Sequence, residues 1–135
     1  MPTEELTERF HDSLERCQQN RGFLDAFYDR FLAASPEIPS YFANTDFNRQ
    51  KQVLTMSFYH LLSATAGNPE SHLHIQRIAE VHATRHIPRA LYDVWLDCLI
   101  ETVVQYDPKY TPEVGDTWRE FMAPAIEAMR AAAPT

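Results

Sequence analysis

Apolar residues recur every three or four positions along most of this chain, which is the spacing of helices that bury one face. Two adjacent rows in one segment illustrate the pattern: Phe23, Phe27 and Phe31, and beside them Leu24, Tyr28 and Leu32. Only three glycines occur, too few for the turns of a β-rich fold. The pattern predicts long helices at about 3–19, 22–34, 46–66, 71–84, 89–107 and 111–129, with a short helical corner at about 36–42.

These elements predict an all-α single domain over residues 1–135. No internal repeat, linker or low-complexity tract interrupts the sequence. Periodicity alone does not separate a regular helix bundle from other all-α folds, so the choice depends on candidate site residues.

Charge and hydropathy argue against several functional classes. The chain carries a formal net charge of −7, which argues against a nucleic-acid partner. No run approaches 18 apolar residues, so no membrane association through a transmembrane helix is expected. The first ten residues, MPTEELTERF, lack the basic and apolar regions of a signal peptide. We therefore expect a cytoplasmic protein, in which Cys17 and Cys98 are free and buried.

One of the six histidines stands on an apolar helical face. His82 follows Ile78 by four residues and Ile75 by seven. This setting suits an imidazole that ligates a flat macrocycle, although an isolated histidine is more often a core residue bonded to a carbonyl. His86 competes for the role but lies beside Pro88, where the helix ends. Of the others, His11, His72 and His74 are expected at the solvated surface, and His60 at a rim or in packing.

Three more polar groups stand on apolar helix faces. Burying Tyr28 or Gln50 without a partner would cost on the order of 1–3 kcal/mol. Either both side chains face a polar ligand in a pocket, or they bond to each other or to a carbonyl. Trp95 also faces inward and brings one N–H donor, but a plain core tryptophan explains it equally well.

An ordered set of residues resembles the globin family, in its bacterial single-domain and sensor-globin branch. Phe27-Tyr28 is similar to the family's distal tyrosine position. Phe42, six residues after Pro36, is similar to the corner phenylalanine that stacks on haem. The segment Gln50-Lys51-Gln52-Val53-Leu54 resembles the distal segment, with a glutamine over the iron and a leucine one turn later.

The intervals continue the resemblance through about residues 20–130. His82 follows Leu54 by 28 residues, and Tyr92 follows His82 by ten, as in bacterial globins in which a tyrosine contacts the proximal histidine. Trp118 resembles the tryptophan near the start of the last helix. The resemblance implies a globin fold, with about six long helices and a short corner helix enclosing haem.

The resemblance also implies roles for individual residues. His82 would ligate the iron of haem b (iron protoporphyrin IX), and Tyr92 would orient its ring. Tyr28, Gln50 and Trp95 would face the ligand on the distal side. The remaining residues implied to contact the cofactor are Phe42, Leu54, Ile78, Ile87 and Arg85.

Several positions depart from the family pattern. His86 stands where the corner usually carries a glycine. Val53 stands where a basic residue can reach a haem propionate, which leaves Arg49, Arg85 and His86 as alternatives. The last helix has no glutamate where some bacterial globins pair one with the tyrosine, and a family glycine in the preceding helix is missing.

The implied function is reversible binding of O₂, and of CO or NO, with slow O₂ release. Three alternatives stay open. The first is a nitric oxide dioxygenase or weak peroxidase, which would need a separate reductase because no reductase sequence follows the last helix. The second is a gas-sensing module that signals through a partner protein. The third is a haem-free globin-like protein, against which His82 weighs. Apolar residues on the last two helices also leave a homodimer open.

Overall fold

The computed structural model describes residues 4–132, which contain seven helices and no strand. The helices are α1 (Glu4–Gln18), α2 (Phe23–Ala34), α3 (Ile38–Tyr41), α4 (Phe47–Thr65), α5 (Pro69–Thr84), α6 (Ala90–Tyr106) and α7 (Pro112–Ala132). The predicted all-α class is therefore confirmed, with six long helices and a short one at the corner.

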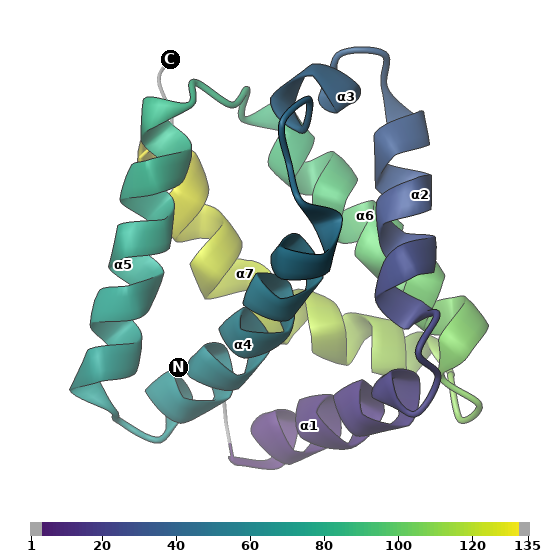
Figure 1. Ribbon diagram of the computed structural model, residues 1–135. Helices are drawn as coiled ribbons and strands as arrows, with labels where there is room; N and C mark the ends of the chain where they lie inside the picture. The colour runs from purple at the N-terminus through teal and green to yellow at the C-terminus, as the bar shows by residue number, and fades with distance from the viewer. Residues whose placement is uncertain (1–3, 133–135) are drawn as a thin grey trace.

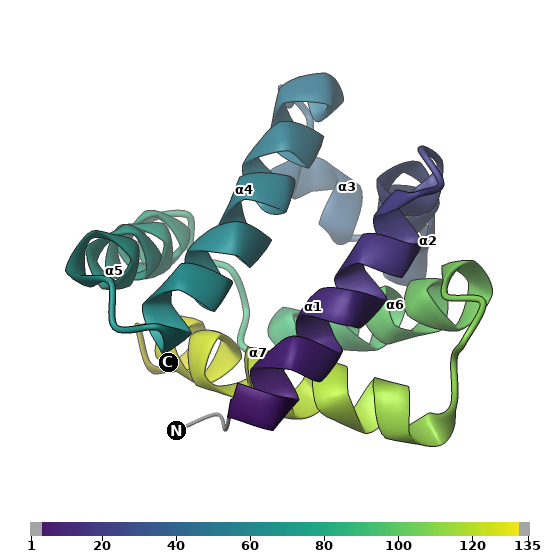
Figure 2. The same cartoon turned by 90° about the horizontal axis from the view of Figure 1, so that it is seen from below.

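The helices cross one another rather than running parallel. In Figure 1, α5 lies on one side of the molecule and α2 and α6 lie on the other, with α4 and α7 crossing between them. The main packing partners are α2 with α6, α4 with α5, and α7 with α1, α5 and α6. Seen from below in Figure 2, α1 crosses α7. The helices α4 and α5 pack on each other and supply many of the residues that line an interior cavity.

Side-chain caps fix where α4 and α5 begin. The Asp46 carboxylate accepts hydrogen bonds from the backbone N–H groups of Asn48 and Arg49, at 3.0 and 3.4 Å. Asn68 caps α5 in the same way, and Pro69 follows at the first helical position. The predicted start of α5 near residue 71 is therefore two residues late, because Gly67-Asn68-Pro69 ends one helix and also starts the next.

An aromatic core fills the end of the molecule where α1, α4 and α7 meet. Phe10 stacks on Phe121, with ring centroids 3.9 Å apart, and its edge meets Trp118 at 4.7 Å. Phe58 from α4 packs edge-on against the same tryptophan at 5.9 Å. Such aromatic pairs add to the free energy gained from area burial. They hold α1 and α7 together next to the interior cavity, which Phe58 also lines.

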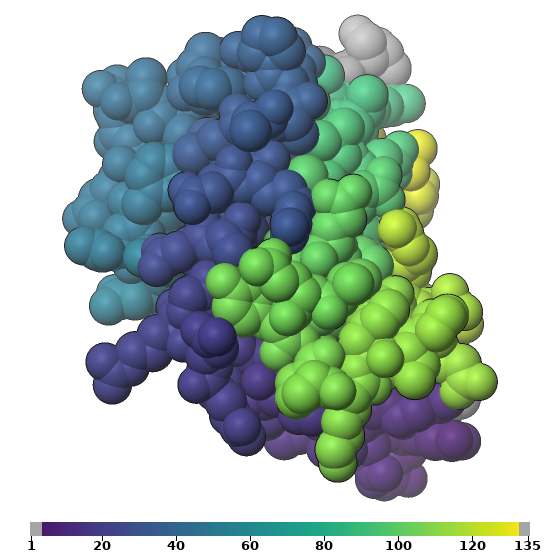
Figure 3. All heavy atoms as spheres, turned by 90° about the vertical axis from the view of Figure 1, so that its right-hand side faces the viewer, coloured from purple at the N-terminus to yellow at the C-terminus, as the bar shows by residue number. Residues whose placement is uncertain are grey.

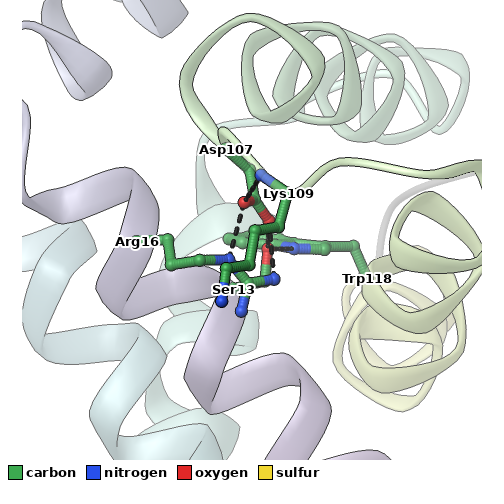
Figure 4. Close-up of polar contacts among 5 residues, drawn as sticks. All are labelled: Ser13, Arg16, Asp107, Lys109 and Trp118. Atoms are coloured by element: carbon green, nitrogen blue, oxygen red, sulfur yellow. Dashed lines mark hydrogen bonds and ion pairs between the residues drawn. The ribbon is translucent and has the colours of Figure 1, made fainter.

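A buried polar cluster, shown in Figure 4, links α1, α7 and the loop after α6. Trp118 Nε1 donates to Ser13 Oγ at 2.8 Å, and Ser13 Oγ donates to the Asp107 carboxylate at 2.7 Å. The Arg16 guanidinium binds both carboxylate oxygens, at 2.6 and 2.9 Å, and the backbone N–H of Lys109 adds a fourth bond. Burial raises the pKa of Asp107, but these hydrogen bonds and the Arg16 charge outweigh it and lower the pKa overall.

Some apolar residues of the sequence pattern are not in the core. Leu73 and Val81 of α5, although apolar, are each 51% exposed. Both cysteines are free and buried, as expected. Figure 3 shows the face formed by α2 and α6, where a shallow groove lies between the two helices. No helix in the described range 4–132 is long and apolar enough to cross a bilayer.

Candidate functional site

A cavity of about 490 Å³ lies between α4 and α5 and reaches α2, α3, α6 and α7. The volume is within the usual range for small-molecule and cofactor sites. Most of its lining is apolar, from residues such as Phe31, Ile38, Leu61 and Ile126. All ten site residues predicted from the sequence line this one cavity: Tyr28, Phe42, Gln50, Leu54, Ile78, His82, Arg85, Ile87, Tyr92 and Trp95.

His82 stands in the last turn of α5 with its ring partly buried against the cavity. Its Nδ1 lies 2.7 Å from the carbonyl oxygen of Ile78. A carbonyl can only accept, so Nδ1 carries the proton and the neutral ring keeps its lone pair on Nε2. Burial lowers the pKa of His82, the hydrogen bond to Ile78 opposes this, and the Arg85 charge lowers it further. The side chain is thus a neutral imidazole with one nitrogen available as a ligand.

Tyr92 lies on the same side of the cavity as His82. The two ring centroids are 6.3 Å apart, with the rings tilted by 50°. No hydrogen bond joins the two side chains, because Nδ1 of His82 donates to the carbonyl oxygen of Ile78 one turn earlier on α5. The Tyr92 hydroxyl is buried and has no hydrogen-bond partner among the described residues. In this structure the Ile78 carbonyl fixes the His82 ring, and Tyr92 only packs beside it.

Tyr28 and Gln50 reach the cavity from two further helices, α2 and α4. Burial raises the pKa of the Tyr28 phenol to about 12, and interaction with the Gln50 side chain opposes that shift. The phenol therefore stays protonated at neutral pH and can donate a hydrogen bond. The two side chains therefore lie near each other, and both line the cavity.

An aromatic group holds Tyr28 in place. Its ring packs edge-on against Phe42 and Phe47, with centroids at 6.2 and 5.5 Å, and those two rings stack on each other at 5.7 Å. On α6, Trp95 is half-buried and meets Phe27 edge-on at 5.5 Å. Trp95 therefore combines core packing with a position in the cavity wall.

The other histidines differ in their positions. His74, expected at the solvated surface, lines the cavity, and its Nε2 is buried without a partner in the described part of the chain. Its ring stacks on His60 of α4 at 3.9 Å, which bears out a packing role for His60. His11 and His72 are exposed, as expected. His86 is exposed and does not line the cavity.

Sequence reasoning also missed Arg77, which lines the cavity from α5 together with Arg85. Its position one turn before Val81 and two turns before Arg85 is the signal that could have identified it. Val53 of α4 lines the cavity as well, whereas Arg49, one of the expected basic alternatives, does not. The charged side chains at this cavity therefore come from α5.

Comparisons with known proteins agree with this architecture. The Globin family model matches residues 25–129. The crystal structure of protein PA3967 from Pseudomonas aeruginosa PAO1, described as structurally highly homologous to a human hemoglobin, is 32% identical in sequence. It superposes with a TM-score of 0.87 over 96% of this chain and 99% of that chain. Among curated proteins, no sequence matches this chain.

Proposed function

This chain belongs to the globin family, and from that premise we propose that its cavity holds one haem b and that the protein binds O₂ reversibly, and CO or NO in the same place. We take the whole chain as one globin domain. When bound, haem would supply an iron atom to which a diatomic gas can bind.

The observation that carries the proposal is the state of His82. A neutral imidazole with Nδ1 bonded to a carbonyl presents Nε2 as a ligand, and the carbonyl fixes the direction in which the ring points. The low pKa of this ring keeps protons from competing with a metal at neutral pH. The apolar lining around the imidazole fits the flat hydrophobic body of a porphyrin.

Other residues that line the cavity would contact the porphyrin and the gas ligand. Phe42 and Leu54 would pack on the distal face of the porphyrin, and Ile78 and Ile87 on the proximal face. Tyr28 and Gln50 would donate hydrogen bonds to a polar ligand in the distal space, each worth about 1–3 kcal/mol. Such bonds slow ligand escape roughly tenfold for each 1.4 kcal/mol. Trp95 would narrow the same space.

The test is a visible absorption spectrum of the purified protein reconstituted with hemin, in its ferric, ferrous and ferrous-CO states. We expect a stoichiometric haem complex that binds CO and forms an oxygenated species with slow O₂ release. His82→Ala should abolish stable haem incorporation, whereas the matched variant His72→Ala, at an exposed position on the same helix, should not. A protein that stays colourless with hemin, or a His82→Ala variant with an unchanged spectrum, would contradict the proposal.

A further inference from the structure

Two histidines join α4 to α5 close to the short connection between these helices (Figure 1). The rings of His60, from α4, and His74, from α5, are tilted by only 26°, with their centroids 3.9 Å apart. Nδ1 of His60 also lies 3.3 Å from Oγ of Ser71, a buried residue of α5. We call these three residues the histidine clasp. The clasp ties together two helices that both line the cavity.

His74 has a buried nitrogen that no protein group serves. Its Nε2 has no hydrogen-bond partner in the part of the chain that the structure describes. A neutral imidazole donates from one ring nitrogen only, whereas an imidazolium donates from both. Because a buried donor without an acceptor is costly, the surroundings of His74 favour the neutral ring over the protonated one.

Charges on and next to α5 oppose protonation of this ring as well. Burial lowers the pKa of His74 most, and the charges of His60 and Arg77 lower it further. Glu70, one turn before His74, is exposed and forms no ion pair with either ring. A protonated His74 would therefore lie beside a second imidazole and a guanidinium group, with no carboxylate bound to it.

The other helices packed against α4 and α5 bring no compensating charge to the clasp. All side chains that α4 and α7 contribute to the cavity lining, which His74 shares, are uncharged. Glu15 of α1 accepts a hydrogen bond from Tyr59, the residue before His60, and forms no ion pair with His60 itself. A proton taken up at His74 thus stays without a counter-ion among the described residues.

We propose that the histidine clasp is a pH-sensitive contact, which holds α5 against α4 at neutral pH and releases it when the His74 ring takes up a proton. Only Ser71 and Ala79 of the described α5 side chains are buried, so the clasp is a large share of the packing of this helix. Release of the clasp loosens the wall of the cavity, because α4 and α5 both line it. The proposal concerns the protein without ligand and does not depend on haem.

The direction of the pH dependence follows from the two states of the chain. In the unfolded chain, His74 takes up a proton near the ordinary imidazole pKa of about 6.5, whereas its pKa in the fold is lower. The stability that the neutral ring contributes is therefore complete above about pH 6.5. It is lost progressively as the pH falls from there to the lower pKa of the folded state.

The test is amide hydrogen exchange of the full chain without hemin at about pH 7 and about pH 5, corrected for the pH dependence of intrinsic exchange. We expect protection in residues 57–65 and 69–78 to fall about threefold or more on acidification, relative to α6. In His74→Phe, whose ring can stack on His60 but does not titrate, protection should fall less than about twofold. His72→Phe, at an exposed histidine of the same helix, is the matched control and should behave like the unmodified chain.

A second variant, His74→Gln, keeps a neutral polar side chain and gives the same test if phenylalanine does not fit the site. A fall in protection as large in both variants as in the unmodified chain would overturn the proposal, because another titrating group would then be responsible. Protection that does not change between the two pH values in the unmodified chain would overturn it as well. The effect of His74→Phe should persist in His82→Ala, so this result is independent of whether the cavity holds haem.

Discussion

At the scale of single residues, neutral polar groups with fixed hydrogen-bonding roles define the candidate site. Burial keeps the Tyr28 phenol protonated, and the Ile78 carbonyl leaves Nε2 of His82 free. These two states place a hydrogen-bond donor and a basic nitrogen at one cavity, which is what a gas-binding haem pocket requires. No charged neighbour shifts the pKa of Tyr28, whereas the Arg85 charge contributes to the lowered pKa of His82.

Tyr28→Phe should speed O₂ release about three- to tenfold, because one hydrogen bond to the ligand would be lost. CO release should change less, since bound CO accepts a weaker hydrogen bond. Stopped-flow measurement of ligand release checks the prediction. Tyr59→Phe is the control, because that phenol is exposed and bonds to Glu15 and Gln18 outside the cavity. An unchanged O₂ release rate in Tyr28→Phe would remove this phenol from the ligand's surroundings.

His86, just after the C-terminal end of α5, has a backbone conformation that lowers the stability of the fold. His86 has φ of +55°, in the left-handed region that an L side chain enters at about 1 kcal/mol or more. His86→Gly should therefore raise the free energy of unfolding by about 0.5–1 kcal/mol in urea denaturation. Gly67→Ala is the converse control: its φ is +89° and nothing lies near the added Cβ, so the substitution should lower stability through backbone strain alone.

At the scale of elements, two groups of helices have different tasks. The α1–α7 contact is closed by aromatic packing and by the buried Asp107 cluster, whereas α4 and α5 enclose the cavity. Only Ser71 and Ala79 of the described α5 side chains are buried, against eight in α6. In the protein without ligand, α5, which carries His82, is thus less firmly packed than α6.

The Asp107 cluster makes a prediction about acid stability. The pKa of the Asp107 carboxyl group is lowered in the folded state. Its contribution to the free energy of unfolding is therefore complete above the unfolded pKa of about 3.9, and it is lost as the pH falls through the lower pKa of the folded state. Asp107→Asn should cost about 2–4 kcal/mol at pH 7 and should lose less stability than the unmodified protein below pH 4. Asp97→Asn, in an exposed pair with Arg119, should cost less than about 1 kcal/mol. Equal effects of the two variants would contradict the assignment.

At the scale of the whole molecule, the fold is a closely packed half joined to a half that encloses the cavity. We expect amide hydrogens of α5 to exchange faster than those of α6 in the apoprotein, because local opening of α5 exposes little buried surface. Hemin should slow exchange in α5 at least tenfold, through the coupling of binding to stability. Exchange in α1, which does not line the cavity, gives the reference. An α5 already as protected as α6 before hemin is added would refute this view.

The sequence by itself determined the all-α class, the approximate helix boundaries and ten of the residues that line the cavity. These features depend on short-range periodicity, on caps and on an ordered series of intervals, all of which are present in the linear chain. The predicted start of α5 was two residues late, which is a local error. The helix begins at Pro69 because Asn68 caps it, and the capping geometry becomes clear only once the helix is formed.

Only the tertiary structure decided which groups meet. The crossing of the helices and the orientation of the side chains set the hydrogen-bond partner of His82 and leave the Tyr92 hydroxyl without one among the described residues. They also stack His74 on His60 and place Arg77 in the cavity lining. A periodic pattern specifies which face of a helix is apolar, but it does not specify the neighbour across that face. Charge and burial at a single position therefore follow from the packing of distant segments.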